Sequence, residues 1–370
     1  DAIAASTLGR ALAEWTGQPA RLDWHPARGA RQQLWCELPL FSVYAVPNAG
    51  PLVRRFLADS LRFSPSPWRS VPQAAVVTAM ATSAGVRLAG RPAFALEPGM
   101  DRATQRLVMP GNRRIRLFDF ASGVTRVVAK TGTAPAILED EVAFRRQGGE
   151  GPFLDILDSG PGWFDEPILD AVSLPRLPPW CSGARPERRA LDALERYCEP
   201  RRVAVPLGDH LARLSAEVGA SLRALGFDAL ATSRYQARIA GLCRFGGEVL
   251  VGPSHGDCQP GNALWERSGR ITWTDWEFQG QRSEHYDRLV FALRFRFAEG
   301  LSERVLAAIG GRVPAGADLP ASVAERRRAL AIALVEDIAL VTGARASCGQ
   351  KGPPAGLSEL LLSLELVERR

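Results

Sequence analysis

The sequence predicts an α+β fold in which an antiparallel sheet comes first and a largely helical region follows. Short apolar runs separated by turn residues lie between positions 105 and 130, as in strands joined by hairpins. From residue 187 onward, apolar side chains instead recur every three or four residues, as on amphipathic helices. At 370 residues the chain is long for one domain, so two or three structural units are expected.

The composition argues against several classes of protein. Hydrophobic residues make up 46% of the chain and charged residues 23%, as in an ordinary globular protein. No apolar run approaches the ~18 residues of a membrane helix, so we expect no membrane span. The net charge of +6 comes without a basic run that carries interleaved aromatic residues, so nucleic-acid binding is not indicated. The six scattered cysteines and the lack of a visible secretory leader predict reduced thiols in a cytoplasmic protein.

Residues 1–105 are expected to form an accessory module or an elaboration of the sheet that follows. The patterns predict helices over 8–15 and 52–61 and one or two strands over 34–46. The apolar run 74–84 fits either a buried helix or a strand, because periodicity alone does not separate the two. We assign no chemistry to this region.

Three antiparallel strands are predicted next, over 106–109, 115–120 and 124–130. The third strand ends at Lys130, one of only two lysines among the 46 basic residues of the chain. A lysine inside an apolar strand is a candidate binding residue, whereas Lys351 lies in a Gly/Pro loop and is expected to be solvated. The loop between the first two strands contains Gly111 and Asn112, whose backbone N–H groups are candidates for covering phosphates.

The remaining elements follow the same patterns. A short helix is predicted over 136–145 and two further strands over 153–158 and 167–174, and a Pro-rich segment, 174–186, separates the two halves of the chain. Helices are predicted over 188–197, 209–225, 235–242, 302–309, 321–344 and 356–368, with another opening at His285.

The strongest functional signal is the loop His255-Gly256-Asp257 with Asn262, followed by a hairpin that leads to Asp275. Equal arms on either side of the turn 267–270 return the chain to its starting end. Asn262 and Asp275 are therefore expected side by side, near Asp257. One carboxylate that accepts a hydroxyl proton, with an amide and a second carboxylate that hold Mg²⁺, is the set that phosphoryl transfer uses.

This run resembles the H-G-D-x-x-x-x-N…D-W-E signature of the aminoglycoside phosphotransferase and choline kinase family, completed here by Asp275-Trp276-Glu277. The resemblance implies a bilobal protein-kinase-like fold with an antiparallel β N-lobe over 106–175, a helical C-lobe over 176–370 and the first 105 residues as an N-terminal extension. It implies transfer of the γ-phosphoryl group of ATP to a hydroxyl of a small molecule of aminoglycoside, amino-alcohol or sugar type.

The resemblance also implies roles for single residues. Asp257 would be the catalytic base and His255 would stiffen its loop, while Asn262 and Asp275 would bind Mg²⁺. Asp287 would support the loop from beneath.

The nucleotide side of the site is implied in the same way. Lys130 would meet the α- and β-phosphates, together with the backbone of Gly111 and Asn112. Glu141 would pair with Lys130, because it matches the family's helix pattern; Glu139 is the rival for that pairing.

Two alternatives stay open. A metal-dependent hydrolase would use His255, Asp257, His285 and Asp287 as ligands, although the chain has only four histidines and no H-E-x-x-H. A catalytically silent nucleotide-binding pseudokinase or scaffold would keep the fold without turnover. The acceptor is not readable from the sequence, because it depends on details of the helical half.

Overall fold

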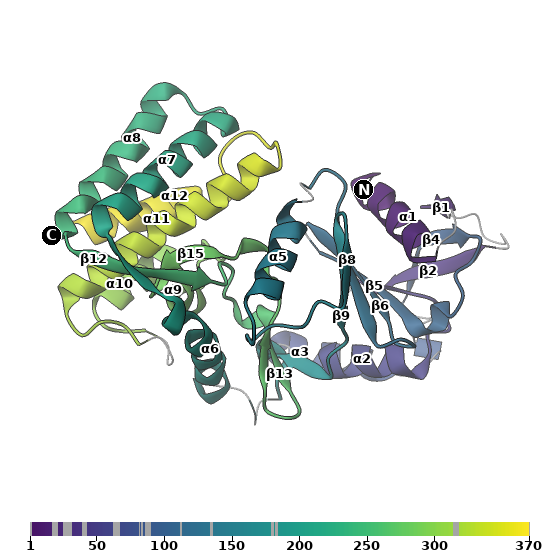
Figure 1. The fold of residues 1–370 in the computed structure, drawn as a ribbon. Coiled ribbons are helices and arrows are strands. Elements are labelled where there is room, and N and C mark those ends of the chain that lie inside the picture. Colours follow the sequence, from purple (N-terminus) through teal and green to yellow (C-terminus); the bar gives the residue numbers. More distant parts are fainter. Residues whose placement is uncertain are drawn as a thin grey trace. The chain divides into compact units, whose positions relative to one another are not determined.

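The structure is a computed structural model that describes residues 2–16, 21–24, 32–38, 43–61, 67–80, 82, 84–85, 90–111, 113–133, 136–178, 181, 184–313 and 318–369. The chain divides into two compact units. The first contains Asp1–Gly149, Phe153–Cys181 and Leu264–Arg270, and the second contains Glu150–Pro152, Ser182–Ala263 and Ile271–Arg370. Figure 1 labels the elements of both units.

A nine-stranded sheet with antiparallel pairing organises the first unit, in the order β1-β4-β2-β3-β5-β6-β7-β9-β8. Its strands are β1 (Arg21–Asp23), β2 (Gln33–Leu38), β3 (Val43–Ala45), β4 (Arg91–Glu97), β5 (Arg106–Pro110), β6 (Arg114–Asp119), β7 (Val124–Ala129), β8 (Asp158–Gly160) and β9 (Trp163–Pro167). The four strands that precede residue 105 thus belong to the same sheet as the predicted hairpins.

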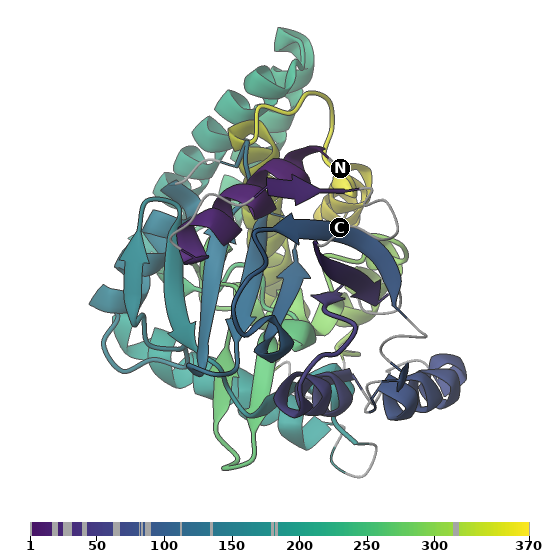
Figure 2. The same cartoon turned by 90° about the vertical axis from the view of Figure 1, so that its right-hand side faces the viewer.

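Helices cover both faces of this sheet. α1 (Ala2–Thr16) packs Leu12 into the core cluster that contains Leu117, whereas α2 (Pro51–Leu61) packs Leu57 into a cluster with Phe118. Because neighbouring strand residues point to opposite faces, Leu117 and Phe118 place α1 on one face and α2 on the other. Figure 2 shows α1 lying across the strands.

Two more helices complete the face that α2 covers. α3 (Pro67–Met80) contributes Val77 to the same cluster as α2. The run from residue 74, which fits either a helix or a strand, is therefore a helix as far as Met80. α5 (Ala136–Gln147) packs Leu138 and Val142 against Val127 of β7. The short 3₁₀ helices η1 (Ala103–Gln105) and η2 (Leu174–Arg176) and the strand β10 (Ala171–Ser173) also belong to this unit.

One predicted strand of the first unit is wrong. Residues 153–157 are not a strand, and β8 begins only at Asp158. The carbonyl oxygen of Leu154 accepts hydrogen bonds from the Arg145 guanidinium, at 3.1 Å from Nε and 2.6 Å from Nη2. The run is therefore a loop whose first residues, Phe153 and Leu154, are buried, and its backbone accepts from a side chain of α5. Of the run 167–174, only Pro167, which ends β9, and the three residues of β10 are strand.

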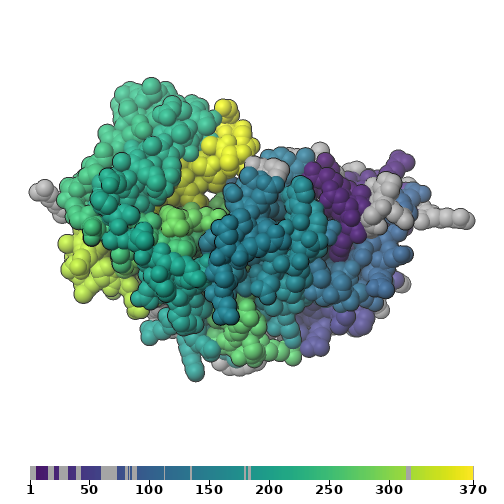
Figure 3. All heavy atoms as spheres, in the orientation of Figure 1, coloured from purple at the N-terminus to yellow at the C-terminus, as the bar shows by residue number. Residues whose placement is uncertain are grey.

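The second unit is mainly helical, with α11 at its centre. Its helices are α6 (Ala184–Cys198), α7 (Leu207–Leu225), α8 (Ala229–Gly241), α9 (Tyr286–Leu293), α10 (Leu301–Ile309), α11 (Val323–Ser347) and α12 (Leu357–Glu368). α11 begins at a capping box, in which Ser322 Oγ accepts from the Glu325 N–H and donates to the Glu325 carboxylate. It packs against α7, α9, α10 and α12, and Figure 3 shows α7 and α8 at the surface of this unit.

A small antiparallel sheet, β11-β12-β15, lies in the same unit, with β11 (Val203–Pro206), β12 (Glu248–Ser254) and β15 (Gly280–Ser283). The predicted hairpin has β13 (Ala263–Glu266) and β14 (Ile271–Trp273) as its arms, and its segment Leu264–Arg270 belongs to the first unit. The 3₁₀ helices here are η3 (Glu199–Arg201), η4 (Leu242–Phe245), η5 (Pro260–Asn262) and η6 (Trp276–Phe278). Within the described ranges, no helix combines the length and apolar character needed to cross a membrane.

Candidate active site

The candidate site lies in the second unit, in the loop that follows β12. β12 runs through Gly252-Pro253 and ends at Ser254, and the loop ends in the single turn of η5. This places the residues of the His255–Asn262 motif between a buried strand and the first arm of the hairpin.

Asp287, in the first turn of α9, anchors the start of this loop. Its carboxylate accepts hydrogen bonds from Ser254 Oγ at 3.0 Å, the His255 N–H at 2.8 Å and the Gly256 N–H at 3.1 Å. Three donors on one carboxylate fix the loop backbone where it leaves the strand. The expected supporting role of Asp287 agrees with these contacts.

Gly256 is required at its position for steric reasons. Its φ is +81°, which is a left-handed conformation that glycine adopts freely. A Cβ at Gly256 would lie 1.9 Å from the carbonyl oxygen of Phe278. The H-G-D tripeptide therefore needs its glycine so that the loop can pass this backbone.

His255 is completely buried and connects the loop to the hairpin. Its Nδ1 accepts from the Asp257 N–H at 3.2 Å, and its Nε2 lies 2.8 Å from the Thr274 carbonyl oxygen. Because Nδ1 accepts, the ring proton is on Nε2 and is donated to Thr274. The ring also packs against Trp273 and Trp276, with centroids 5.2 Å and 4.7 Å away.

Both ring nitrogens of His255 are therefore occupied by protein groups. The hydrolase hypothesis needed His255 as a metal ligand, and it loses that ligand. Asp287, another member of the same set, is already bonded to the loop backbone. Among the residues that the structure describes, no group of three or more His, Cys, Asp or Glu side chains is arranged to hold a metal ion.

Asp257 and Asn262 contact each other directly. Asn262 Nδ2 donates to the Asp257 carbonyl oxygen at 2.9 Å and to its carboxylate Oδ2 at 3.1 Å. The other carboxylate oxygen, Oδ1, accepts from Gln259 Nε2 at 2.9 Å and from Arg296 Nε at 2.8 Å. These contacts hold the Asp257 carboxylate in one orientation at a partly exposed position.

The hairpin returns Asp275 to the same end. The Thr274 N–H donates to the Asn262 carbonyl oxygen at 2.9 Å, so Asp275 follows a residue that is bonded to Asn262. Asp275 has φ 66° and ψ 51°, a left-handed conformation that is uncommon outside glycine. Strained backbone of this kind is concentrated at functional sites.

The ligand types at this end suit Mg²⁺. Asn262 uses Nδ2 for both of its side-chain bonds, which leaves its carbonyl oxygen Oδ1 as an acceptor. Asp275 supplies a carboxylate. Amide and carboxylate oxygens are the hard ligands that Mg²⁺ prefers, and Mg²⁺ sites in kinases use few protein ligands because phosphate oxygens and water supply the rest.

In the first unit, Lys130 adjoins the loop between β5 and β6. The Lys130 N–H donates to the Arg113 carbonyl oxygen at 2.8 Å, and the Gly111 N–H donates to the Arg114 carbonyl oxygen at 2.8 Å. Lys130, which directly follows β7, and the loop at Gly111 thus lie together. Asn112 lies outside the described residues.

The predicted ion pair between Glu141 and Lys130 is wrong in this structure. Glu141 has a side chain only 1% exposed, and it pairs with Arg114 Nη1 at 2.9 Å and Arg145 Nη1 at 3.1 Å. Arg145 also pairs with Glu166 at 2.9 Å. The sequence pattern does not indicate that Arg114, on β6, pairs with this glutamate of α5.

The rival partner does not replace Glu141. Glu139 lies on the exposed side of α5. Within the described chain, Lys130 Nζ has no carboxylate partner.

Two acids of α11, Glu336 and Asp337, interrupt an apolar helix in the sequence, a pattern that fits either an acceptor site or, more simply, a helix face turned to solvent. In the structure both side chains are buried, so the solvent-facing interpretation is wrong. Glu336 accepts from Ser283 N and Oγ, each at 2.6 Å, and lies 2.8 Å from His210 Nε2. Asp337 bonds to Arg296 and Tyr286 beside the loop, which brings two unpredicted residues to the site. Adjacent acids inside an apolar helix were the available signal.

No protein-family model matches the chain, and no curated protein matches it. Solved structures with similarity to it include kinases of the family that the loop motif resembles. A choline/ethanolamine kinase family protein from Mesorhizobium loti is 14% identical, over 70% of this chain and 92% of that chain, with a TM-score of 0.39. Choline kinase LicA from Streptococcus pneumoniae is 11% identical, over 73% and 92%, with a TM-score of 0.40.

An aminoglycoside phosphotransferase from Alicyclobacillus acidocaldarius is 13% identical, over 70% of this chain and 89% of that chain, with a TM-score of 0.35. Likeness at this level does not determine an activity. The function proposed below therefore rests on the side chains of the site.

Proposed function

We propose that the chain is a small-molecule kinase, which transfers the γ-phosphoryl group of ATP to a hydroxyl of an acceptor of aminoglycoside, amino-alcohol or sugar type. The observation that carries this proposal is the contact of Asn262 with the Asp257 carboxylate, in a loop that Asp287 holds through three hydrogen bonds. In the catalytic loop of protein kinases, an Asp and an Asn at this spacing act as the base and as one metal ligand, and we assign the same roles to Asp257 and Asn262.

The proposed fold assignment is bilobal and protein-kinase-like. Residues 106–175 would form the N-lobe, with residues 1–105 as its elaboration, and residues 176–370 would form the helical C-lobe. The strands β5 to β7 followed by α5, and the helical second unit, support this assignment. A cytoplasmic location, where ATP is supplied, is part of the proposal.

In the proposed reaction, Asp257 accepts a hydrogen bond from the acceptor hydroxyl and orients its oxygen toward the γ-phosphorus. The O–P bond forms as the bond from the γ-phosphorus to the ADP oxygen breaks, and the hydroxyl proton moves to Asp257. His255 keeps the loop in place through Thr274, so the carboxylate need not reorganise. Most of the rate enhancement would come from positioning and from charge stabilisation.

Asn262 Oδ1 and the Asp275 carboxylate would hold Mg²⁺. When bound, the ion would neutralise charge on the phosphate oxygens. Lys130 and the backbone of the Gly111 loop would contact the nucleotide phosphates. Glu141 would act at a distance from the phosphates, as the acid that orders Arg114 and Arg145 within the sheet core.

The test is transfer from radiolabelled ATP to a panel of amino-alcohols, aminoglycosides and sugars, with the Asp257→Asn variant beside the unaltered chain. Asp257→Asn should lower transfer by about 10²–10⁴-fold, the range of a lost general base. Binding of Mg²⁺ with a non-hydrolysable ATP analogue should be retained. Full activity in this variant would remove Asp257 from its role, and nucleotide binding without turnover on the whole panel would favour the pseudokinase alternative.

A further inference from the structure

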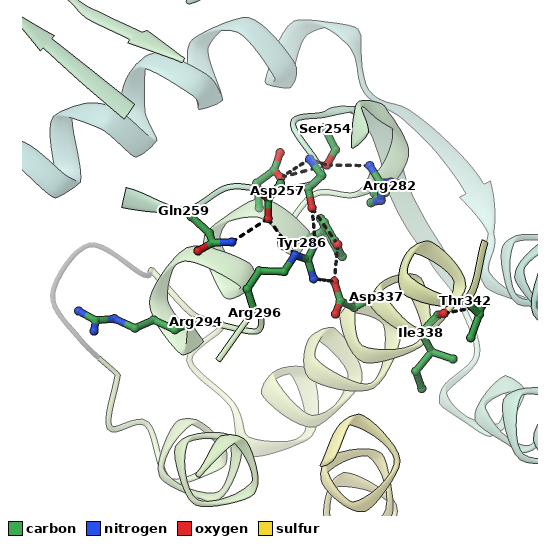
Figure 4. Close-up of polar contacts among 12 residues, drawn as sticks. Ser254, Asp257, Gln259, Arg282, Tyr286, Arg294, Arg296, Asp337, Ile338 and Thr342 are labelled. Carbon is green, nitrogen blue, oxygen red and sulfur yellow. Dashed lines mark hydrogen bonds and ion pairs between the residues drawn. The ribbon is translucent and has the colours of Figure 1, made fainter. Parts of the chain in front are cut away.

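Arg296 links the candidate catalytic carboxylate to a buried acid. Its Nε donates to Asp257 Oδ1 at 2.8 Å, one terminal nitrogen donates to Asp337 Oδ1 at 2.5 Å, and the other donates to the Gly256 carbonyl oxygen at 2.7 Å. Figure 4 shows the guanidinium between Asp257 and Asp337. The planar group therefore has a fixed place with three different partners.

Asp337, the buried partner of Arg296, lies in the helical core of the second unit. Asp337 has a side chain 1% exposed, on the central helix α11. Tyr286 is also buried, and its hydroxyl lies 2.7 Å from Asp337 Oδ1 and 3.2 Å from the Gly256 carbonyl oxygen. A buried acid needs a compensating charge, and Arg296 supplies it to Asp337.

Burial lowers the pKa of the Arg296 guanidinium, but Asp337, Tyr286 and Asp257 outweigh this effect, and the pKa lies well above its usual value. Arg296 therefore keeps its positive charge beside Asp257. An exposed surface pair would hold the Asp257 carboxylate less firmly, because its partners separate easily.

The contacts at Asp257 distinguish its two carboxylate oxygens. Each carboxylate oxygen has two lone pairs, and Oδ1 already accepts from both Arg296 Nε and Gln259 Nε2. Oδ2 accepts only from Asn262 Nδ2 among the described residues. The oxygen with a remaining lone pair for an incoming hydroxyl is therefore Oδ2.

We propose that Arg296 is a positioning residue for phosphoryl transfer, which occupies Asp257 Oδ1 so that Oδ2 faces the acceptor hydroxyl, and that Asp337 and Tyr286 hold Arg296 in this place. This inference rests on the proposed function. It assigns the proton-accepting atom and gives the buried acid of α11 a part in the reaction.

The single variant Arg296→Met does not separate positioning from stability, since it leaves Asp337 buried without its cation and should destabilise the fold. The double variant Arg296→Met with Asp337→Asn removes one positive and one negative charge together, and the amide oxygen introduced on α11 can still accept from Tyr286. Its melting temperature should therefore recover toward that of the unaltered chain.

The decisive measurement is kcat against KM in the folded double variant, with ATP and the panel compound that the unaltered chain phosphorylates. We expect kcat to fall by about 10²-fold, the loss typical of a misplaced catalytic group, with KM for ATP changed less than twofold. The conservative variant Arg296→Lys should recover only part of kcat, because one ammonium cannot bond all three partners.

Arg238→Met is the matched control, because Arg238 pairs with Glu365 and Glu368 away from the loop. It should keep the kcat of the unaltered chain. A folded double variant with unchanged kcat would overturn the positioning role of Arg296. A lack of transfer by the unaltered chain on the whole panel would overturn the proposed function, and the role of Arg296 with it.

Discussion

Asn262 donates from one nitrogen to two oxygens of Asp257, the main-chain carbonyl at 2.9 Å and carboxylate Oδ2 at 3.1 Å. The same amide therefore stabilises the loop and the carboxylate, and its own oxygen Oδ1 is left for a metal ion. The residue thus connects the conformation of the loop with the chemistry proposed for it.

Replacing this amide should change the metal dependence of transfer. In Asn262→Ala the affinity for Mg²⁺ should fall by about 10–100-fold, because a ligand and the bond to Asp257 are lost together. The measurement is the Mg²⁺ concentration at half-maximal transfer. Asn48→Ala, at an exposed position of the first unit, is the control and should leave that concentration unchanged. An unaltered Mg²⁺ requirement in Asn262→Ala would exclude Asn262 as a ligand.

The glycine of the loop can be tested against a second glycine of the same loop. Gly256→Ala should destabilise the protein by about 3 kcal/mol or more, because the new Cβ meets the Phe278 carbonyl oxygen and φ is positive. Gly261→Ala places its Cβ where no atom lies within 4 Å and should be nearly neutral. Urea unfolding of both variants is the measurement. Equal stabilities would contradict the steric account.

Asp287 should contribute to stability and activity together. Asp287→Ala removes the acceptor for three donors of the loop, so we expect a loss of about 3 kcal/mol in the free energy of unfolding. The transfer rate should also fall, since the loop backbone at Asp257 loses its anchor. Asp318→Ala is the control, because Asp318 is 80% exposed in a pair with Arg288. Wild-type unfolding in Asp287→Ala would show that the loop needs no such anchor.

Substitutions of Glu141 and Lys130, which the family resemblance implies as a pair, should affect different properties of the protein. Glu141→Ala leaves Arg114 and Arg145 buried without this acid, and should cost about 3–5 kcal/mol of stability. Lys130→Met should leave the melting temperature nearly unchanged but weaken binding of the ATP analogue. Lys351→Met, at the only other lysine, controls for the loss of a positive charge. Unchanged nucleotide affinity in Lys130→Met would remove Lys130 from the proposed phosphate site.

His285 should make stability depend on pH. Burial lowers the pKa of His285 below its usual value, an effect that Glu284 opposes only in part. The unfolded chain therefore binds a proton at His285 more readily than the folded chain does. The contribution of neutral His285 to the free energy of unfolding is complete above the unfolded pKa of about 6.5 and is lost as pH decreases below it. Melting temperatures of the unaltered chain and of His285→Gln, compared between about pH 8 and about pH 5.5, check this. The variant should lose less stability on acidification, and identical slopes would contradict the account.

Local patterns predicted the elements well where a single face or a turn decides them. The strands around Ile115 and Val127 and the hairpin at Ala263 occur as expected, because alternation and turn residues are local signals. The expected proximity of Asp257 and Asn262 is also found, because the two residues belong to one short loop.

Long-range partners could not be read in the same way. Arg114 reaches Glu141 across 27 positions, and Arg296 reaches Asp257 across 39. Nothing in the spacing of these residues distinguishes them from the many other arginines of the chain. The strand predicted around Leu154 is wrong for a related reason. An apolar segment can be a loop when a side chain, here Arg145, donates to its carbonyl oxygen in place of a neighbouring strand.

The hairpin that follows the candidate loop also bears on how the protein must be made. Its tip, Leu264–Arg270, belongs to the first unit, where Val172 of β10 pairs with Trp265. The partner strand of β10 therefore leaves the ribosome only after α6, α7 and α8 have been synthesised. A nascent chain that stops at residue 181 holds β10 without its neighbour. We therefore expect a fragment of the first unit to pair β10 only when residues 264–270 are joined to it by a designed linker.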